Sequence, residues 1–195
     1  GLLRECCRRW DTPFVKFLVW QSLVRRVRHE SDEEIVQAAR GALASIERDT
    51  TLQIAFSTLG NDGDLLLDDE LTNETDYEKS WHRWRAFHPA LAEKLLEESS
   101  SSGEWIVRIE DFDRQARERG FYPNWGPLAG GLASQSASFA EAAIERCFEN
   151  ETTPLDRVFA VILHDRPNSD EKLKDEWFAR AIESTKEELR CAALG

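Results

Sequence analysis

The feature that most restricts how this chain can fold is a helix start signal followed by apolar residues at helical spacing. Thr12 precedes Pro13, which places a capping hydroxyl before a proline at the first helical position, where no N–H is needed. Behind this start, apolar side chains repeat at i, i+3, i+4 and i+7, namely at Trp20, Leu23, Val24 and Val27. Because the two patterns agree, the sequence predicts a helix with one apolar face after Thr12.

The same combination recurs along the chain. Further start signals stand at 31–34, 75–78, 153–154 and 169–171, and apolar residues at helical spacing follow each of them. A helix that buries one face needs other helices to cover that face, which is the arrangement of a bundle. The sequence therefore predicts a mainly α protein, with residues 1–195 forming a single helical bundle-like domain of seven or eight helices.

One segment favours β-structure inside this helical pattern. Leu52, Ile54 and Phe56 alternate as in a strand, and residues 61–64 have the composition of a turn. This favours a short β-hairpin over residues 51–67. The alternative is a helix that continues to Leu59 and ends at Gly60.

Three further segments read as non-helical. Residues 104–109 are rich in β-forming side chains and predict one strand, while residues 121–133 contain prolines and glycines and predict an ordered loop. The polar run at 99–103 predicts a flexible linker. The predicted fold thus includes a small β-hairpin or strand insertion.

The charge of the chain is large and unevenly distributed. Its 195 residues carry a net charge of −12, but residues 1–29 hold seven basic residues against Glu5 and Asp11, so this segment carries +5 and the remainder −17. Neutralising nucleic-acid phosphates needs clustered Lys and Arg, so nucleic acid is an unlikely partner. A large acidic surface suits a basic protein partner better.

Two observations bear on where the protein is found. No stretch approaches the roughly 18 consecutive apolar residues of a membrane span, so no transmembrane segment is expected. The four cysteines show no Cys-x-x-Cys spacing, which fits reduced thiols and a cytoplasmic location. Asn-x-Thr tripeptides at 73–75 and 150–152 leave a secreted origin open.

A His-Asp pair closes one of the apolar helical segments. His164 and Asp165 directly follow Val161-Ile162-Leu163. This arrangement resembles the central signature of HD-type metal phosphohydrolases, in which the imidazole and the carboxylate bind a metal that activates water. The resemblance implies His164 and Asp165 as metal ligands, with His82 or His88 supplying an earlier histidine, so His82, His164 and Asp165 are the candidate ligands. The alternative is a histidine that offsets the dipole at a helix C-terminus.

A second resemblance lies earlier in the chain. Arg83 and His88 have the Arg-x4-His spacing, which resembles the active motif of the all-helical HEPN ribonucleases. The sequence departs from that motif, because Trp84 follows the arginine where a polar residue is usual and Pro89 follows the histidine. An acidic chain is also unsuited to RNA binding.

An aromatic row marks a candidate binding surface. Tyr77, Trp81, Trp84 and Phe87 recur at helical spacing, and aromatic side chains anchor many ligand pockets and interfaces. The alternative is that these side chains belong to the core, which is the more frequent role of such a row.

Taken together, these patterns predict a non-catalytic protein-interaction module with a large acidic surface, such as an adaptor, an inhibitor or a neutralising protein. No cofactor is expected, because the chain has no phosphate-binding glycine loop and no nucleophile motif. The two alternatives are the HD-like metal-dependent phosphohydrolase, with His88, His164 and Asp165 as catalytic candidates, and a helical domain that binds a small molecule at the aromatic row.

Overall fold

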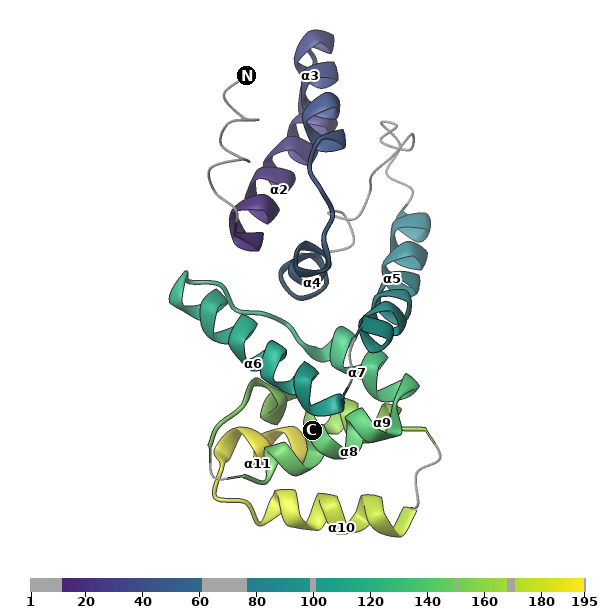
Figure 1. Cartoon of the computed structure of the whole chain (residues 1–195), viewed down its shortest axis with the longest axis vertical. Helices are drawn as coiled ribbons and strands as arrows, with labels where there is room; N and C mark the ends of the chain where they lie inside the picture. The colour runs from purple at the N-terminus through teal and green to yellow at the C-terminus, as the bar shows by residue number, and fades with distance from the viewer. Residues whose placement is uncertain (1–11, 61–76, 99–100, 150, 168–170, 195) are drawn as a thin grey trace. The chain divides into compact units, whose positions relative to one another are not determined.

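A computed structural model describes residues 12–60, 77–98, 101–149, 151–167 and 171–194 (Figure 1). Within these ranges the chain forms ten α-helices and one 3₁₀ helix, and no strand. The predicted mainly α fold is therefore confirmed. The chain divides into two compact units, residues 1–87 and 88–195, which are described separately, and the single domain stays a prediction. In the described ranges, no helix has both the length and the apolar content needed to cross a bilayer.

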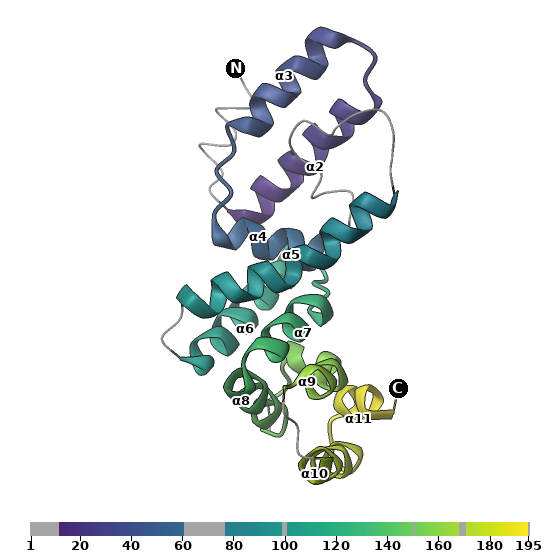
Figure 2. The same cartoon turned by 90° about the vertical axis from the view of Figure 1, so that its right-hand side faces the viewer.

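The first unit is built on the predicted N-terminal helix. α2 (Pro13–His29) begins after Thr12, whose hydroxyl accepts a hydrogen bond from the Val15 amide at 3.4 Å. α2 pairs with α3 (Glu33–Ala44) in a helical hairpin (Figure 2). The cap of α3 differs slightly from the expected box, because Asp32 rather than Ser31 accepts the amide hydrogen bonds that begin this helix.

The residues predicted to form a β-hairpin belong instead to a third helix, α4 (Thr50–Leu59), so the hairpin is wrong over 51–59. Leu52, Ala55 and Phe56 share one helical face that is buried against α2, and this face, not the two-residue alternation, decides the structure. The Phe56 ring meets the Trp20 ring edge-on at 5.0 Å. Residues 61–67 lie outside the described ranges.

Asp49 joins α4 to α2. Its carboxylate accepts a hydrogen bond of 2.8 Å from the Leu52 amide, which caps α4, and one of 2.9 Å from the Lys16 ammonium on α2. Partial burial raises the pKa of Asp49, but Lys16 and the Leu52 amide together outweigh it, so the pKa lies below its ordinary value. Unit 1 thus gains stability from the ionised form of this carboxyl group.

Replacing Asp49 tests this joint. We expect Asp49→Ala to lower the free energy of unfolding of unit 1 by about 1–2 kcal/mol, because the cap and the ion pair are both lost. Asp49→Asn keeps an acceptor for the cap and should cost less. The difference in stability between the native chain and Asp49→Asn should shrink as the pH falls through the lowered pKa of Asp49, because the carboxyl group then becomes protonated in the folded state. Urea titrations followed on the α4 amide resonances measure this, and a pH-independent difference would contradict the role of the charge.

The second unit contains the remaining helices. It begins in α5 (Tyr77–Glu98), which spans the boundary between the units and continues through Pro89 instead of ending there. The elements that follow are α6 (Ser102–Glu118), α7 (Gly126–Gln135), α8 (Ala137–Cys147), η2 (Pro154–Val158), α9 (Phe159–Asp165), α10 (Glu171–Ile182) and α11 (Glu187–Leu194). The start signal at 75–78 falls largely outside the described ranges.

The strand predicted at 104–109 and the linker predicted at 99–103 both differ from the structure, in which α6 includes residues 102–109. Trp105, Ile109 and Phe112 lie one helical turn apart and are buried, so residues 104–109 form part of a helix and not a strand. In the predicted linker, Ser101 is extended and residues 102–103 begin α6, whereas residues 99–100 are not described. The single helix predicted from 169–171 through Leu189 is two helices, because residues 183–186 separate α10 from α11.

The loop predicted at 121–133 is wrong from Gly126 onward, because α7 is a buried helix packed against α8 and α9. Its glycines allow this packing. A Cβ atom on Gly130 would lie 3.0 Å from Val161 Cγ1 and 2.5 Å from Asp165 Oδ2, both on α9. Sequence composition therefore indicated a loop where the glycines serve a close helix contact.

We expect Gly130→Ala to destabilise unit 2 by about 1–3 kcal/mol, because the new methyl group crowds the Val161 side chain and displaces the Asp165 carboxylate. Gly103→Ala is the matched control, since a Cβ atom there meets nothing within 4 Å, and it should leave stability unchanged or raise it. Thermal unfolding of both variants measures the difference. Equal melting temperatures would show that α7 and α9 are not in close contact.

Candidate functional site

The predicted metal ligands are only partly brought together. His164 Nδ1 lies 2.8 Å from Asp165 Oδ1, and the imidazole is 87% exposed at the end of α9. His88 is buried on α5 in unit 2, whereas His82 is exposed on the unit 1 part of that helix. Among the described residues, no three His, Cys, Asp or Glu side chains converge around a point that could hold a metal ion. The phosphohydrolase site stays a prediction.

Most side chains of the predicted aromatic row lie outside the part of the chain that the structure describes. The structure gives no account of the side chains of Tyr77, Trp81, Arg83 and Trp84, and it places Phe87 as half-buried. The ligand pocket predicted on this row and the Arg83–His88 pair therefore both stay predictions.

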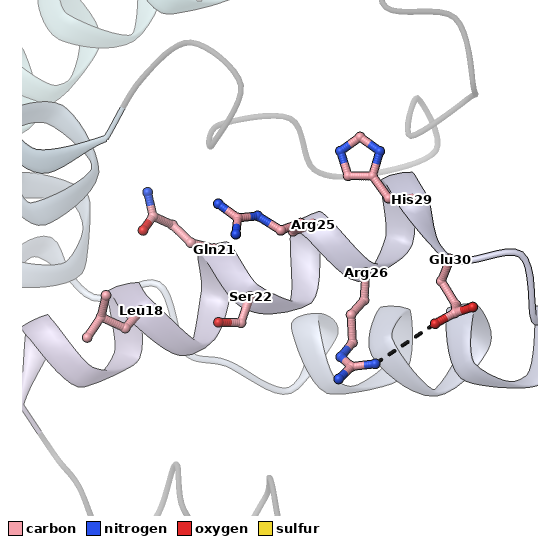
Figure 3. A pocket seen from close by; sticks show the side chains of 7 residues that line it. All are labelled: Leu18, Gln21, Ser22, Arg25, Arg26, His29 and Glu30. Atoms are coloured by element: carbon pink, nitrogen blue, oxygen red, sulfur yellow. Dashed lines mark ion pairs between the residues drawn. The ribbon is translucent and has the colours of Figure 1, made fainter.

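One exposed face of α2 in unit 1 lines a hollow of about 540 Å³ (Figure 3). Gln21, Arg25 and His29 point the same way along this face, while Arg26 pairs with Glu30 at 3.9 Å. Part of the basic N-terminal segment thus lies on a single helix face. The basic side chains in the last turn also offset the partial negative charge at the C-terminus of α2, which accounts for some of them without a ligand.

Unit 2 carries a groove of about 580 Å³ that is lined mainly by residues with charged or polar side chains. It lies where α6 and the end of α8 meet η2 and α11. The lining consists of Glu110, Asp113, Arg114, Arg117, Glu118, Arg146, Glu151, Thr152, Thr153, Pro154, Arg157 and Glu188. Four guanidinium groups therefore face five carboxylates in one depression.

A hydrogen-bond network centred on Lys186 builds one side of the groove. The Lys186 side chain is only 11% exposed, and its ammonium donates to the carbonyl oxygens of Cys147 at 2.8 Å and Glu151 at 2.6 Å. It also donates to Asp156 Oδ1 at 3.2 Å. We call these groups, with Thr153, the Lys186 network. It ties the end of α8, the 151–153 segment, η2 and the start of α11 to one cation.

The Asp156 carboxylate is the buried centre of the network. Its second oxygen accepts the Thr153 amide at 3.0 Å, which completes the capping box that begins η2. Burial raises the pKa of Asp156, and the Thr153 amide and Lys186 oppose this rise only in part. Ionising Asp156 therefore costs folding free energy, and Lys186 reduces that cost. Burial also raises the pKa of the Cys147 thiol, which keeps it protonated.

Each groove arginine is already paired with a carboxylate. Arg146 Nε donates to Glu110 at 2.8 Å, and its Nη atoms reach Glu149 at 2.9 Å and Glu151 at 3.3 Å. Arg117 pairs with Asp113 at 2.5 Å, Arg114 with Glu118 at 3.1 Å, and Arg157 with Glu188 at 2.7 Å. The groove has therefore little positive charge to offer an anion.

The carboxylates retain the capacity to accept more hydrogen bonds. Both Arg157 contacts fall on Glu188 Oε1, while Oε2 is buried without a hydrogen-bond partner. Glu151 and Glu118 are 84% and 57% exposed on the rim. A carboxylate has about four lone-pair positions, so the exposed carboxylates of Glu118 and Glu151 can receive additional donors, whereas the buried Glu188 Oε2 is out of reach of a bound molecule. The arrangement suits N–H donors of a bound molecule.

Sequence reasoning did not find this groove. Residues 110, 113, 114 and 117 form a polar stripe at helical spacing, which is a readable signal once α6 is known to be a helix. The residues that complete the groove lie up to 78 positions further along the chain, at Glu188. No protein-family model, curated protein or solved structure matches the chain.

We expect Lys186→Met to lower the free energy of unfolding of unit 2 by about 3–5 kcal/mol, because Asp156 is left as a buried carboxylate without its cation. Lys172→Met removes an exposed lysine of α10 and should change stability by less than about 0.5 kcal/mol. Adding Asp156→Asn to Lys186→Met should recover part of the loss. Chemical denaturation of these variants and of Asp156→Asn alone measures the coupling, and additive effects would contradict the network.

Proposed function

We propose that the protein is a non-catalytic protein-interaction module and that the polar groove of unit 2 receives a basic segment of its partner. The observation that carries this proposal is which charged groups of the groove are already paired and which can still accept a hydrogen bond. Its arginines are each engaged by a carboxylate, whereas the carboxylates of Glu118 and Glu151 extend from the rim into solvent and can accept further hydrogen bonds. Lysine and arginine side chains supply the missing donors.

The net charge of unit 2 also favours a basic partner. Residues 88–195 contain 21 acidic and 13 basic residues, a net charge of −8. A negative field of this kind attracts a basic partner from a distance, and contacts at the groove then determine where it binds. An adaptor, an inhibitor or a neutralising protein with an acidic surface would act in this way.

Binding of a labelled oligolysine peptide tests the proposal. Fluorescence anisotropy should give saturable binding that weakens as salt is raised, with an oligoglutamate peptide of equal length as the negative probe. We expect Glu118→Gln with Glu151→Gln to weaken binding about tenfold, because two exposed acceptors at the rim are lost. Loss of both carboxylates leaves the paired arginines Arg114 and Arg146 with their other partners, Asp111 and Glu110.

The matched control is Glu93→Gln with Glu97→Gln. These two residues are exposed on α5 in the same unit, so the control removes the same charge away from the groove. It should weaken binding by less than about threefold. Equal losses in the two double variants would mean that only net charge attracts the peptide. Absence of oligolysine binding at low salt would contradict the proposal.

A further inference from the structure

α10 is the outermost helix of unit 2 in both views (Figure 1, Figure 2). Of its twelve residues, only Trp177 and Ala181 are fully buried. Phe178 adds an edge-on contact with Phe159 at 6.1 Å, while Ile182 stays exposed to solvent. α10 therefore contributes little apolar area to the core of the unit.

Packing against α11 and side-chain contacts to α8 and to the end of α9 hold the helix in place. Trp177 Nε1 and Arg180 Nη1 donate to the two oxygens of Glu145, at 3.3 Å and 3.2 Å. The Arg180 guanidinium also lies over the Phe148 ring, 3.9 Å from its centre. We call this set of contacts, together with Arg166, the α10 seam. Its contacts are mostly polar and partly exposed, so water can replace many of them.

The Arg166 guanidinium is the unfavourable member of the seam. Its side chain is only 8% exposed, lies over the Trp177 ring at 5.1 Å, and pairs with Glu141 through Nη2. Its Nε and Nη1 atoms are buried without a hydrogen-bond partner. A guanidinium has five N–H donors, and those left dry lose their hydration without gaining a hydrogen bond. Movement of Trp177 away from Arg166 would return water to these donors.

We propose that α10 is a displaceable helix, which leaves the α10 seam while the rest of unit 2 stays folded. The Lys186 network explains why the remainder survives. Lys186 precedes α11 and binds Cys147, Glu151 and Asp156, so α11 stays attached to α8 and η2 when α10 moves. Displacement exposes the side chains of Trp177 and Arg166 to solvent.

Hydrogen exchange of the full chain, followed by mass spectrometry, tests the proposal. Peptides from 171–182 should exchange at least about tenfold faster than peptides from α7 and α8 under native conditions. Arg166→Met should slow exchange in 171–182 about fivefold, because methionine fills the space against Trp177 and brings no unpaired N–H. Arg119→Met, at the end of α6, is the matched control and should leave 171–182 unchanged.

A second variant keeps the test decisive if Arg166→Met folds poorly. Trp177→Ala removes the apolar anchor of α10, so it should speed exchange in 171–182 while peptides from α7, α8 and α9 keep their rates. Faster exchange of 171–182 in Arg166→Met would show that this arginine holds the helix down and would overturn the proposal. Exchange of 171–182 at the same rate as α8, or loss of protection throughout unit 2 in Trp177→Ala, would also overturn it.

Discussion

The contact between Lys186 and Asp156 is the interaction on which the architecture of unit 2 depends. A buried carboxylate is unfavourable unless a cation and N–H donors compensate it, and here one lysine and one backbone amide do so. Because the same ammonium also satisfies two backbone carbonyls, a single cation fixes the relative positions of α8, η2 and α11. The groove exists because these elements are fixed: Arg157 and Glu188 come from the two elements that the network joins.

The groove and the α10 seam show two ways in which charged side chains are arranged in one small unit. In the groove, arginines and carboxylates are matched on a surface that water reaches, and spare acceptors remain. In the seam, one guanidinium is buried beneath an indole ring with donors left over. Spare acceptors at a surface suit a partner with positive charge, whereas spare donors in a dry contact weaken that contact. The same ion-pair chemistry thus favours binding in one place and movement in the other.

The sequence predicted the helices whose apolar periodicity and caps agree, such as the one after Thr12, whereas the helix predicted after Thr153 begins as the 3₁₀ helix η2 and continues as α9. The prediction failed where the local composition favours a loop but the segment is a buried helix in the core. Gly126–Gln135 looks like a loop because glycine and proline are poor helix formers, whereas the close packing of Gly130 against α9 and of Gly131 against α5 favours the helix. The groove was not predictable, because ion pairs such as Arg146–Glu110 and Arg157–Glu188 join residues 36 and 31 positions apart. The His164–Asp165 contact was foreseeable, since the two residues are neighbours in the chain.

The glycines of α7 have a consequence for how this helix forms. Three of its ten residues are glycines, and each lowers helix propensity by about 1 kcal/mol relative to alanine. An isolated α7 segment is therefore mostly unstructured, and it becomes helical only when α8 and α9 are present to pack against it. Six of its ten residues are buried, so this helix depends on tertiary packing for its own secondary structure.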